Sequence, residues 1–290
     1  MRVPGPIDLH THSSVSDGTE TPAELIAAAA AAGIGTVALT DHDSTAGWAE
    51  ASEAAERTGV GLLPGMELST RRGWASIHML GYLFDPADEA LLAETTRIRT
   101  DRLSRAETMV DRIAQDYELE WADVVAQTTP GATVGRPHIA DALVARGHSR
   151  DRGEAFATIL HWRAGYYEPH YAPEPLEGVR LIRAAGGVPV IAHPAVSRDR
   201  LPPVDYLAEL VDAGLFGVEA RHRDNSPDGV RELLRLADHF GLQITGSSDY
   251  HGTGKHNRLG ENTTDPEVAE MIIAEATGWK PVLPEQSTRT

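Results

Sequence analysis

The sequence predicts an α/β protein built on either an open parallel sheet or a TIM-like barrel. The main observation is that short runs of β-forming residues alternate with helical segments toward both ends of the chain. The second is the length, because 290 residues with 41% hydrophobic and 24% charged content suit one large globular domain, with or without an insertion. The third is a central stretch of about 75 residues without a convincing strand, which indicates a helical insertion.

The first third of the chain alternates between strands and helices. The expected strands are residues 7–12, 36–39, 60–63 and 76–83, and the expected helices lie at residues 22–32 and 44–57. Thr21 is the predicted N-cap of the first helix, because Pro22 occupies the first helical position and Glu24 the third. Gly33 and Gly59 are expected to end the two helices.

The middle of the chain is expected to be helical throughout, with helices at residues 87–117, 136–147 and 151–161. We therefore predict that residues 1–85 and 165–290 form the barrel and that residues 86–164 form an insertion domain that caps the substrate. The alternative is that these helices are ordinary outer helices of a single domain.

Alternation resumes in the last third of the chain. Helices are expected at residues 176–185, 203–213 and 226–240, and strands at residues 188–192, 217–220 and 242–246. Repeated βα units of this size favour a parallel sheet or barrel, whose active face lies at the carboxyl ends of the strands.

The composition restricts the chemistry. No cysteine is present, which excludes disulfides, thiolate zinc sites and cysteine nucleophiles and leaves His, Asp and Glu as strong metal ligands. Neither a signal peptide nor an apolar run of about 18 residues is visible, so we expect a cytoplasmic protein. The net charge of −17 argues against long duplex nucleic acid, whereas a small phosphorylated substrate stays compatible once divalent cations are bound.

Histidines and acids are concentrated at the predicted strand ends. His10 and His12 lie two residues apart on a strand, so both side chains leave the same face. The other candidates follow or lie within further strands: Asp41, His42, Glu67, His78, His193, Asp249 and His251. Six strands that deliver such residues to one rim predict a metal site.

Each candidate also has a simpler interpretation. An isolated histidine near a strand end more often packs in a core or caps a helix. Asp41 could cap the following helix or orient a neighbouring histidine, and Asp17 has the local character of a turn residue.

Five motifs in order resemble those of the PHP (polymerase and histidinol phosphatase) superfamily, over residues 7 to about 260. They are Asp8-Leu9-His10-Thr11-His12-Ser13, Ser16-Asp17-Gly18-Thr19, Thr40-Asp41-His42-Asp43, Ala192-His193-Pro194 and Ser247-Ser248-Asp249-Tyr250-His251-Gly252. The resemblance implies a distorted seven-stranded (β/α) barrel with three metal ions. Its ligand sets would be His10, His12, Glu67 and Asp249 for one ion, Glu67, His78 and His193 for a second, and Asp17, His42 and His251 for a third. We expect Asp8 and Asp41 to support these ligands without binding metal.

These ligand types suit Mn²⁺, Fe²⁺ or Zn²⁺. Paired ions lower the pKa of a bridging water and neutralise phosphoryl oxygens, so we expect hydrolysis of a phosphate ester by a metal-bridging hydroxide, with Glu67 and Asp249 as catalytic ligands. Neither a Gly-x-Ser-x-Gly elbow nor a Walker loop occurs, which disfavours a serine hydrolase and a nucleotide-dependent kinase or ATPase.

Two further blocks resemble one branch of that superfamily, the phosphoesterases that remove the 3′-phosphate from nucleoside 3′,5′-bisphosphates; some of its members also trim short RNA from the 5′ end. The blocks contain the residues expected to bind phosphate: Arg136, His138, Arg221 and His222. His222 is also the candidate proton donor. Arg136 begins a predicted helix, whose N-terminus adds amides for anion binding.

Residues 161–167 depart from the Gly- and Lys/Arg-rich loop usual in that branch. Arg163 is expected to replace the missing positive charge, and the aromatic side chains Trp162, Tyr166 and Tyr167 either stack on a base or pack the insertion on the barrel.

Two alternatives remain. The metal motifs are equally compatible with a histidinol-phosphate phosphatase. A non-enzymatic role, as a metal-dependent sensor or a polymerase accessory-like domain, is disfavoured because every expected ligand is present.

Overall fold

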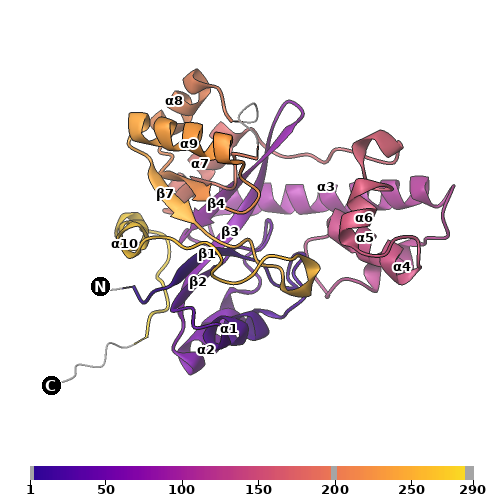
Figure 1. The fold of residues 1–290 in the computed structure, drawn as a ribbon, viewed down its shortest axis with the longest axis horizontal. Helices are drawn as coiled ribbons and strands as arrows, with labels where there is room; N and C mark the ends of the chain where they lie inside the picture. Colours follow the sequence, from indigo (N-terminus) through magenta and orange to yellow (C-terminus); the bar gives the residue numbers. More distant parts are fainter. Residues whose placement is uncertain (1–2, 197–200, 285–290) are drawn as a thin grey trace.

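Seven strands form one sheet that is nearly closed into a barrel (Figure 1). The computed structural model describes residues 3–196 and 201–284, so residues 1–2, 197–200 and 285–290 of the two predicted barrel segments lie outside the described residues. The strands neighbour one another in sequence order: β1 (Ile7–Thr11), β2 (Thr36–Leu39), β3 (Gly61–Arg72), β4 (Ala75–Tyr82), β5 (Val188–Ile191), β6 (Gly217–Arg221) and β7 (Gln243–Gly246). The expected distorted seven-stranded barrel is confirmed.

The barrel is closed by a residue that follows β7 in the sequence. Tyr250 forms a parallel bridge with Thr11 of β1, and the backbone N–H of His12 donates to the carbonyl of Tyr250 over 2.8 Å. The carboxyl ends of the first and last strands therefore meet, which brings residues far apart in the sequence to one rim.

The barrel is distorted by β4, which runs antiparallel to both of its neighbours, whereas the other neighbouring strands are parallel. β3 and β4 form a long hairpin, and their pairing continues from Gly65 opposite Tyr82 to Arg72 opposite Ala75. The predicted strand at residues 60–63 is therefore too short, because this pairing keeps β3 extended to Arg72.

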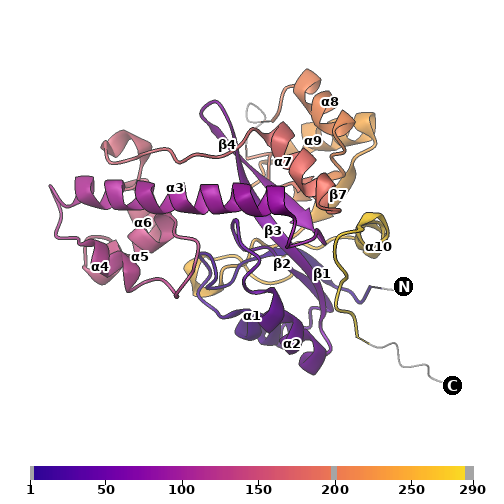
Figure 2. The ribbon, with the colours of Figure 1, turned by 180° about the vertical axis from the view of Figure 1, so that it is seen from behind.

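Helices surround the barrel, and a second group extends to one side (Figures 1 and 2). Around the barrel lie α1 (Pro22–Ala31), α2 (Trp48–Thr58), α7 (Pro175–Ala184), α8 (Val204–Asp212), α9 (Pro227–Phe240) and α10 (Pro266–Glu275). To the side lie α3 (Glu89–Ile113), α4 (Trp121–Val125), α5 (Arg136–Ala145), α6 (Arg152–Ala157) and the short 3-10 helix η1 (Trp162–Ala164). α4 and α10 were not expected from the sequence.

The helix boundaries follow the predicted capping residues closely at α1. Thr21 accepts a hydrogen bond from the backbone of Glu24, and Glu24 accepts one from the backbone of Thr21, so the predicted capping box is confirmed. α2 begins at Trp48, four residues after the predicted start. The residues before it are held against β3, since the N–H of Asp43 donates to the carbonyl of Glu67 over 3.1 Å.

Three hydrophobic clusters stabilise the molecule. One packs the outer helices on the sheet, and a second consists mainly of residues of β1–β5 with Ala269 and Ile272 of α10. The members of the third all come from residues 106–160, so the side group of helices has its own core. The boundaries of a separate domain at residues 86–164 stay a prediction.

α3 connects two of these clusters. Leu91 and Ile98 belong to the cluster of the barrel helices, whereas Ala106 and Met109 belong to the cluster of the side helices. In the part of the chain that the structure describes, no helix is long and apolar enough to cross a membrane.

Leu63 lies fully buried in the strand cluster, whereas Leu92 on α3 is 53% exposed. We expect Leu63→Ala to lower the free energy of unfolding by about 2–5 kcal/mol, because it removes buried methyl groups and leaves a cavity. Leu92→Ala should change it by less than about 0.5 kcal/mol. Urea denaturation of both variants measures the difference, and equal losses would contradict the assignment of Leu63 to the core.

Candidate metal centre

The structure brings all nine sequence-predicted metal ligands together at the rim of the barrel. They come from β1, from the loop after it, from β3 and β4, and from the segments that follow β2, β5 and β7: His10, His12, Asp17, His42, Glu67, His78, His193, Asp249 and His251. Ligand atoms of His10, His12 and Glu67 lie within 4.8 Å of one another, as do those of His42, Glu67 and His78.

Glu67 occupies the middle of this cluster, and its two carboxylate oxygens face different histidines. Oε2 lies 3.2 Å from ring nitrogens of His10, His12 and His42, and Oε1 lies 2.7 Å from His78 Nδ1 and 3.2 Å from His193 Nε2. A carboxylate with histidines on both oxygens has the geometry of a bridging ligand.

A second carboxylate approaches the same histidines from the segment after β7. Asp249 Oδ1 lies 3.3 Å from His12 Nε2 and 3.5 Å from His10 Nε2. His10 Nε2 and His12 Nε2 are 2.9 Å apart, so two nitrogens and two carboxylates converge on one point.

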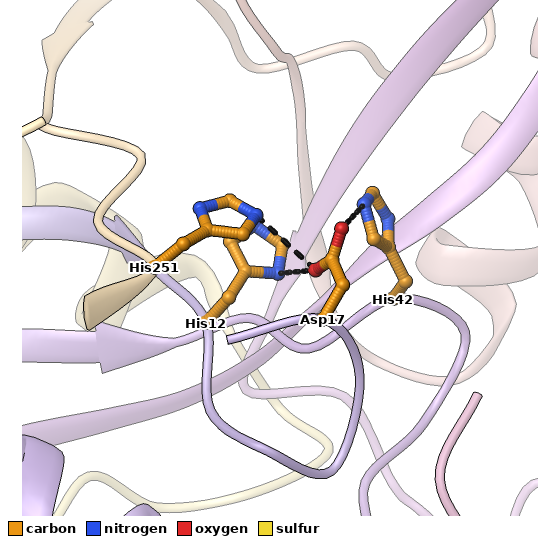
Figure 3. Close-up of side chains that lie close together, drawn as sticks. All are labelled: His12, Asp17, His42 and His251. Carbon is orange, nitrogen blue, oxygen red and sulfur yellow. Dashed lines mark ion pairs between the residues drawn. The ribbon is translucent and has the colours of Figure 1, made fainter. Parts of the chain in front are cut away.

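Asp17 forms the third part of the cluster. Its Oδ1 lies 3.1 Å from His251 Nε2 and 3.7 Å from His12 Nδ1, and its Oδ2 lies 3.8 Å from His42 Nε2 (Figure 3). The local turn that made Asp17 look unremarkable in the sequence therefore places its carboxylate among three imidazoles.

The donor atoms fit divalent cations. Among the described residues, the buried nitrogens His42 Nδ1 and His251 Nε2 lie close to the carboxylates of Glu67 and Asp17 but have no partner in hydrogen-bond geometry. Asp17, Glu67 and Asp249 are at most 6% exposed, and buried charges of one sign need compensation. Imidazole nitrogens and carboxylate oxygens without thiolates suit Mn²⁺, Fe²⁺ or Zn²⁺. The number and identity of the ions stay predictions.

The electrostatic environment keeps the central carboxylate ionised. Burial alone would raise the pKa of Glu67, but the neighbouring imidazoles of His78, His42 and His10 lower it well below its usual value. An ionised Glu67 is the form that binds a cation.

Two of the candidate ligands lie on strained backbone. His193 has φ 29° and Asp249 has φ 53°, a left-handed conformation that residues with a Cβ rarely adopt. Strain of this kind persists only where the surrounding structure enforces it, and it is common at functional sites.

Asp8 and Asp41 hold the loops of the centre through hydrogen bonds. Asp8 accepts from the backbone N–H of Ser248 and of Gly260, and thereby fixes the segment after β7 on β1. Asp41 accepts from Ser13 and from the Ser16 hydroxyl, next to Asp17. The alternative that Asp41 caps α2 is wrong, because Gly47 is the N-cap.

Glu219 on β6 is a buried carboxylate to which the sequence analysis gave no role. Its Oε1 lies 3.1 Å from His10 Nδ1, its Oε2 accepts from the N–H of His193 over 2.8 Å, and the Ser247 hydroxyl donates to it. Burial raises the pKa of Glu219, but His10 and the other nearby histidines lower it to about 2. The signal in the sequence was an acid between the apolar residues Val218 and Ala220 of a strand.

A cavity of about 1040 Å³ opens directly from this cluster. Asp17, His42 and His78 line one part of it, and the helices at the side of the barrel line another. Eight cationic side chains also line it: Arg71, Arg102, Arg105, Arg136, Arg150, Arg152, Arg223 and Lys255. The wall of this cavity is therefore rich in positive charge, although the whole chain has a net charge of −17.

The predicted substrate residues are placed less uniformly than the metal ligands. Of the five, Arg136 is the one that lines the cavity. His138 is buried and caps its own helix by accepting from the N–H of Gly135. Arg163 lies over the ring of Trp162.

Arg221 and His222 are neighbours in the sequence, but their side chains lie in different environments. Arg221 is half-exposed and donates to Asp265 over 2.9 Å, away from the cavity. The buried ring of His222 places Nε2 3.8 Å from Asp249 Oδ2. These positions do not favour direct contact between a substrate phosphate and His138, Arg163 or Arg221.

Comparisons with known proteins agree with this geometry. A family model described as the PHP domain matches residues 8–124. The chain is 35% identical to a 3′,5′-nucleoside bisphosphate phosphatase from Chromobacterium violaceum, over 93% of this chain and 95% of the relative. It is 32% identical to a 5′-3′ exoribonuclease from Haemophilus influenzae, over 88% and 93%. A solved structure from Bifidobacterium adolescentis, assigned to the metal-dependent phosphoesterases, superimposes with a TM-score of 0.91 at 42% identity, over 93% of this chain and 96% of that one.

Glu219→Gln should weaken metal binding about 10- to 100-fold, because the side chain that orients His10 loses its charge while its volume is kept. Titration of Mn²⁺ or Zn²⁺ into metal-free protein measures this affinity. Glu267→Gln, on the exposed face of α10, is the matched control and should leave it unchanged. Equal affinities for all three proteins would remove Glu219 from the support of the centre.

Proposed function

Because this chain belongs to the PHP family and is a metal-dependent phosphoesterase, we propose that it removes the 3′-phosphate from nucleoside 3′,5′-bisphosphates and also accepts short 5′-phosphorylated RNA. The observation that carries this proposal is the cavity, which joins the His/Asp/Glu cluster to a wall rich in guanidinium groups. The two relatives named above act on substrates of this kind, which supports the proposal.

The nine proposed ligands would hold three ions, and Glu67 would belong to two of the three ligand sets. Bound divalent cations neutralise phosphoryl oxygens and activate water for in-line displacement. The role of the protein side chains is to fix the positions of these cations and to orient the ester.

His222 is proposed to give the proton to the leaving oxygen. Its side chain is fully buried beside Asp249, and among the described residues its Nε2 has no hydrogen-bond partner. Its Nδ1 accepts from the backbone N–H of Asp224 over 3.2 Å, which assigns the proton to Nε2, on the side of Asp249.

The charge of the cavity favours a doubly phosphorylated nucleotide over histidinol phosphate. Histidinol phosphate carries one phosphate and a cationic amine, and the amine would meet the same arginines unfavourably. A nucleoside 3′,5′-bisphosphate has two anionic groups and a base that the aromatic side chains Phe156 and Tyr167 of the cavity wall can contact.

A phosphate-release panel tests the proposed substrate. With Mn²⁺, a nucleoside 3′,5′-bisphosphate should be hydrolysed with the highest kcat/KM, a 5′-phosphorylated RNA of a few nucleotides should be shortened, and histidinol phosphate should be a poor substrate. A chelator should abolish turnover and added Mn²⁺ should restore it. Preference for histidinol phosphate, or full activity in chelator, would contradict the proposal.

His222→Gln should lower kcat for the bisphosphate about 10²- to 10⁴-fold, because a general acid is lost. An aryl phosphate, whose leaving group needs no proton, should be hydrolysed almost normally by the same variant. The metal content of the variant and the activity of His239→Gln, an exposed histidine on α9, serve as controls. Equal losses on both esters would exclude His222 as the proton donor.

A further inference from the structure

The loop that carries Asp17 is held in place by the helices at the side of the barrel. This loop, residues 14–17, follows β1, and each of its four residues makes a backbone hydrogen bond with the side group. The first three bonds join the Thr129 hydroxyl to the Ser14 carbonyl over 2.7 Å, the Thr133 N–H to the Val15 carbonyl over 2.9 Å, and the His138 ring to the backbone of Ser16. Docking of the side group on the barrel therefore acts on the segment that positions a candidate metal ligand.

Arg152, the first residue of α6, makes the fourth bond, directly at Asp17. Its Nη1 donates to the Asp17 carbonyl over 3.1 Å, while its Nε and Nη2 donate to the two carboxylate oxygens of Asp141 on α5 over 2.5 and 2.6 Å. A pair of this two-point kind fixes the plane of the guanidinium. The remaining nitrogen therefore reaches the loop from a fixed position.

The same guanidinium also touches the loop after β7. Gly254 lies three residues after His251, and it packs so closely on Arg152 that an added Cβ would clash with Nη1. Arg152 thus contacts two of the loops that supply the third proposed ligand set, in which Asp17 Oδ1 and His251 Nε2 lie 3.1 Å apart (Figure 3). A side chain of the side helices therefore contributes to the spacing of these two ligands.

The Asp17 loop is held from two sides. From the barrel, Asp41 accepts hydrogen bonds from Ser13 and from the Ser16 hydroxyl. From the side group, the bonds described above go to the backbone of all four loop residues. The ligands of the other two proposed sets lie on barrel strands or shortly after them. The third set is therefore the one whose geometry depends on both parts of the molecule.

We propose that Arg152 is a positioning residue for the third metal ion, and that docking of the side helices and binding of this ion are coupled. This rests on the third ligand set of the proposed function, which consists of Asp17, His42 and His251. Groups that orient a metal ligand contribute strongly to the affinity for the metal. The coupling is reciprocal, because an ion that holds the Asp17 loop also holds the carbonyls that the side helices bind.

The coupling bears on catalysis because this ligand set faces the cavity. Asp17 and His42 line the cavity, and so does Arg152. The third ion is then bound tightly only when the helices that form the other wall of the cavity are docked. Ester and ion therefore meet in a molecule whose cavity is complete. His138, for which the sequence predicted a contact with phosphate, takes part in this docking instead.

Calorimetric titration of Mn²⁺ into the metal-free protein tests the role of Arg152. Arg152→Gln should weaken the binding of one ion about 10- to 100-fold and leave the affinity for the others within about twofold. Arg146→Gln is the matched control, because Arg146 pairs with Asp123 inside the same group of helices; it should leave every affinity unchanged. If Arg152→Gln does not fold, as judged by circular dichroism, Asp141→Asn takes its place.

A double-mutant cycle distinguishes positioning from a general loss of stability. In an Asp17→Asn background, Arg152→Gln should cause no further loss of Mn²⁺ affinity, because the ligand that it positions is already removed. Equal losses in both backgrounds, or a loss for all ions alike, would overturn the proposal. Unchanged Mn²⁺ binding by Asp17→Asn alone would overturn it together with the third ligand set.

Hydrogen exchange measures the coupling from the side of the helices. The N–H of Thr133 donates to the loop, so its exchange rate reports the docked state. Mn²⁺ should slow exchange of the segment around Thr133 about fivefold or more in the wild type and leave it unchanged in Asp17→Asn. Equal exchange with and without Mn²⁺ in the wild type would overturn the coupling. Neither measurement uses a substrate, so a protein that shows both effects but hydrolyses no nucleoside 3′,5′-bisphosphate would overturn the proposed reaction alone.

Discussion

The contact of one carboxylate with five imidazoles is the constraint on which the rest of the structure depends. Glu67 reaches histidines from β1, from β4 and from the segments after β2 and β5, so these elements must hold a fixed register around it. A barrel provides this because the carboxyl ends of its strands share one rim. The long β3–β4 hairpin provides the rest, since it carries Glu67 and His78 on paired strands.

The same region joins the barrel to the helices at its side. Asp43, directly after His42, accepts hydrogen bonds from Ser69 of β3 and pairs with Arg102 of α3. The candidate metal centre and the cationic wall of the cavity therefore share one polar network. The net charge of the chain does not indicate this cationic wall, because the excess of acidic residues lies elsewhere on the molecule.

Much of the fold and the metal cluster could be predicted because local rules apply to them. The capping box at Thr21 and the placement of His10 and His12 on one strand follow from short-range patterns. The extension of β3 beyond Pro64-Gly65 could not be predicted from the sequence, because pairing with β4 overrides the local propensity of these residues. Arg105 also escaped prediction, since an arginine on a charge-rich helix looks solvated until the packing around it is known.

α3 fixes the distance between the cationic wall of the cavity and the metal cluster. Its 25 residues extend for about 38 Å at about 1.5 Å per residue, with Leu91 and Ile98 anchored in the cluster of the barrel helices and Met109 in that of the side helices. Arg102 and Arg105 lie between these anchors. Because both ends of the helix are anchored, its backbone sets the separation between these two arginines and the metal cluster. The separation that α3 fixes therefore limits which phosphate esters can reach the metal cluster and the cationic wall at the same time.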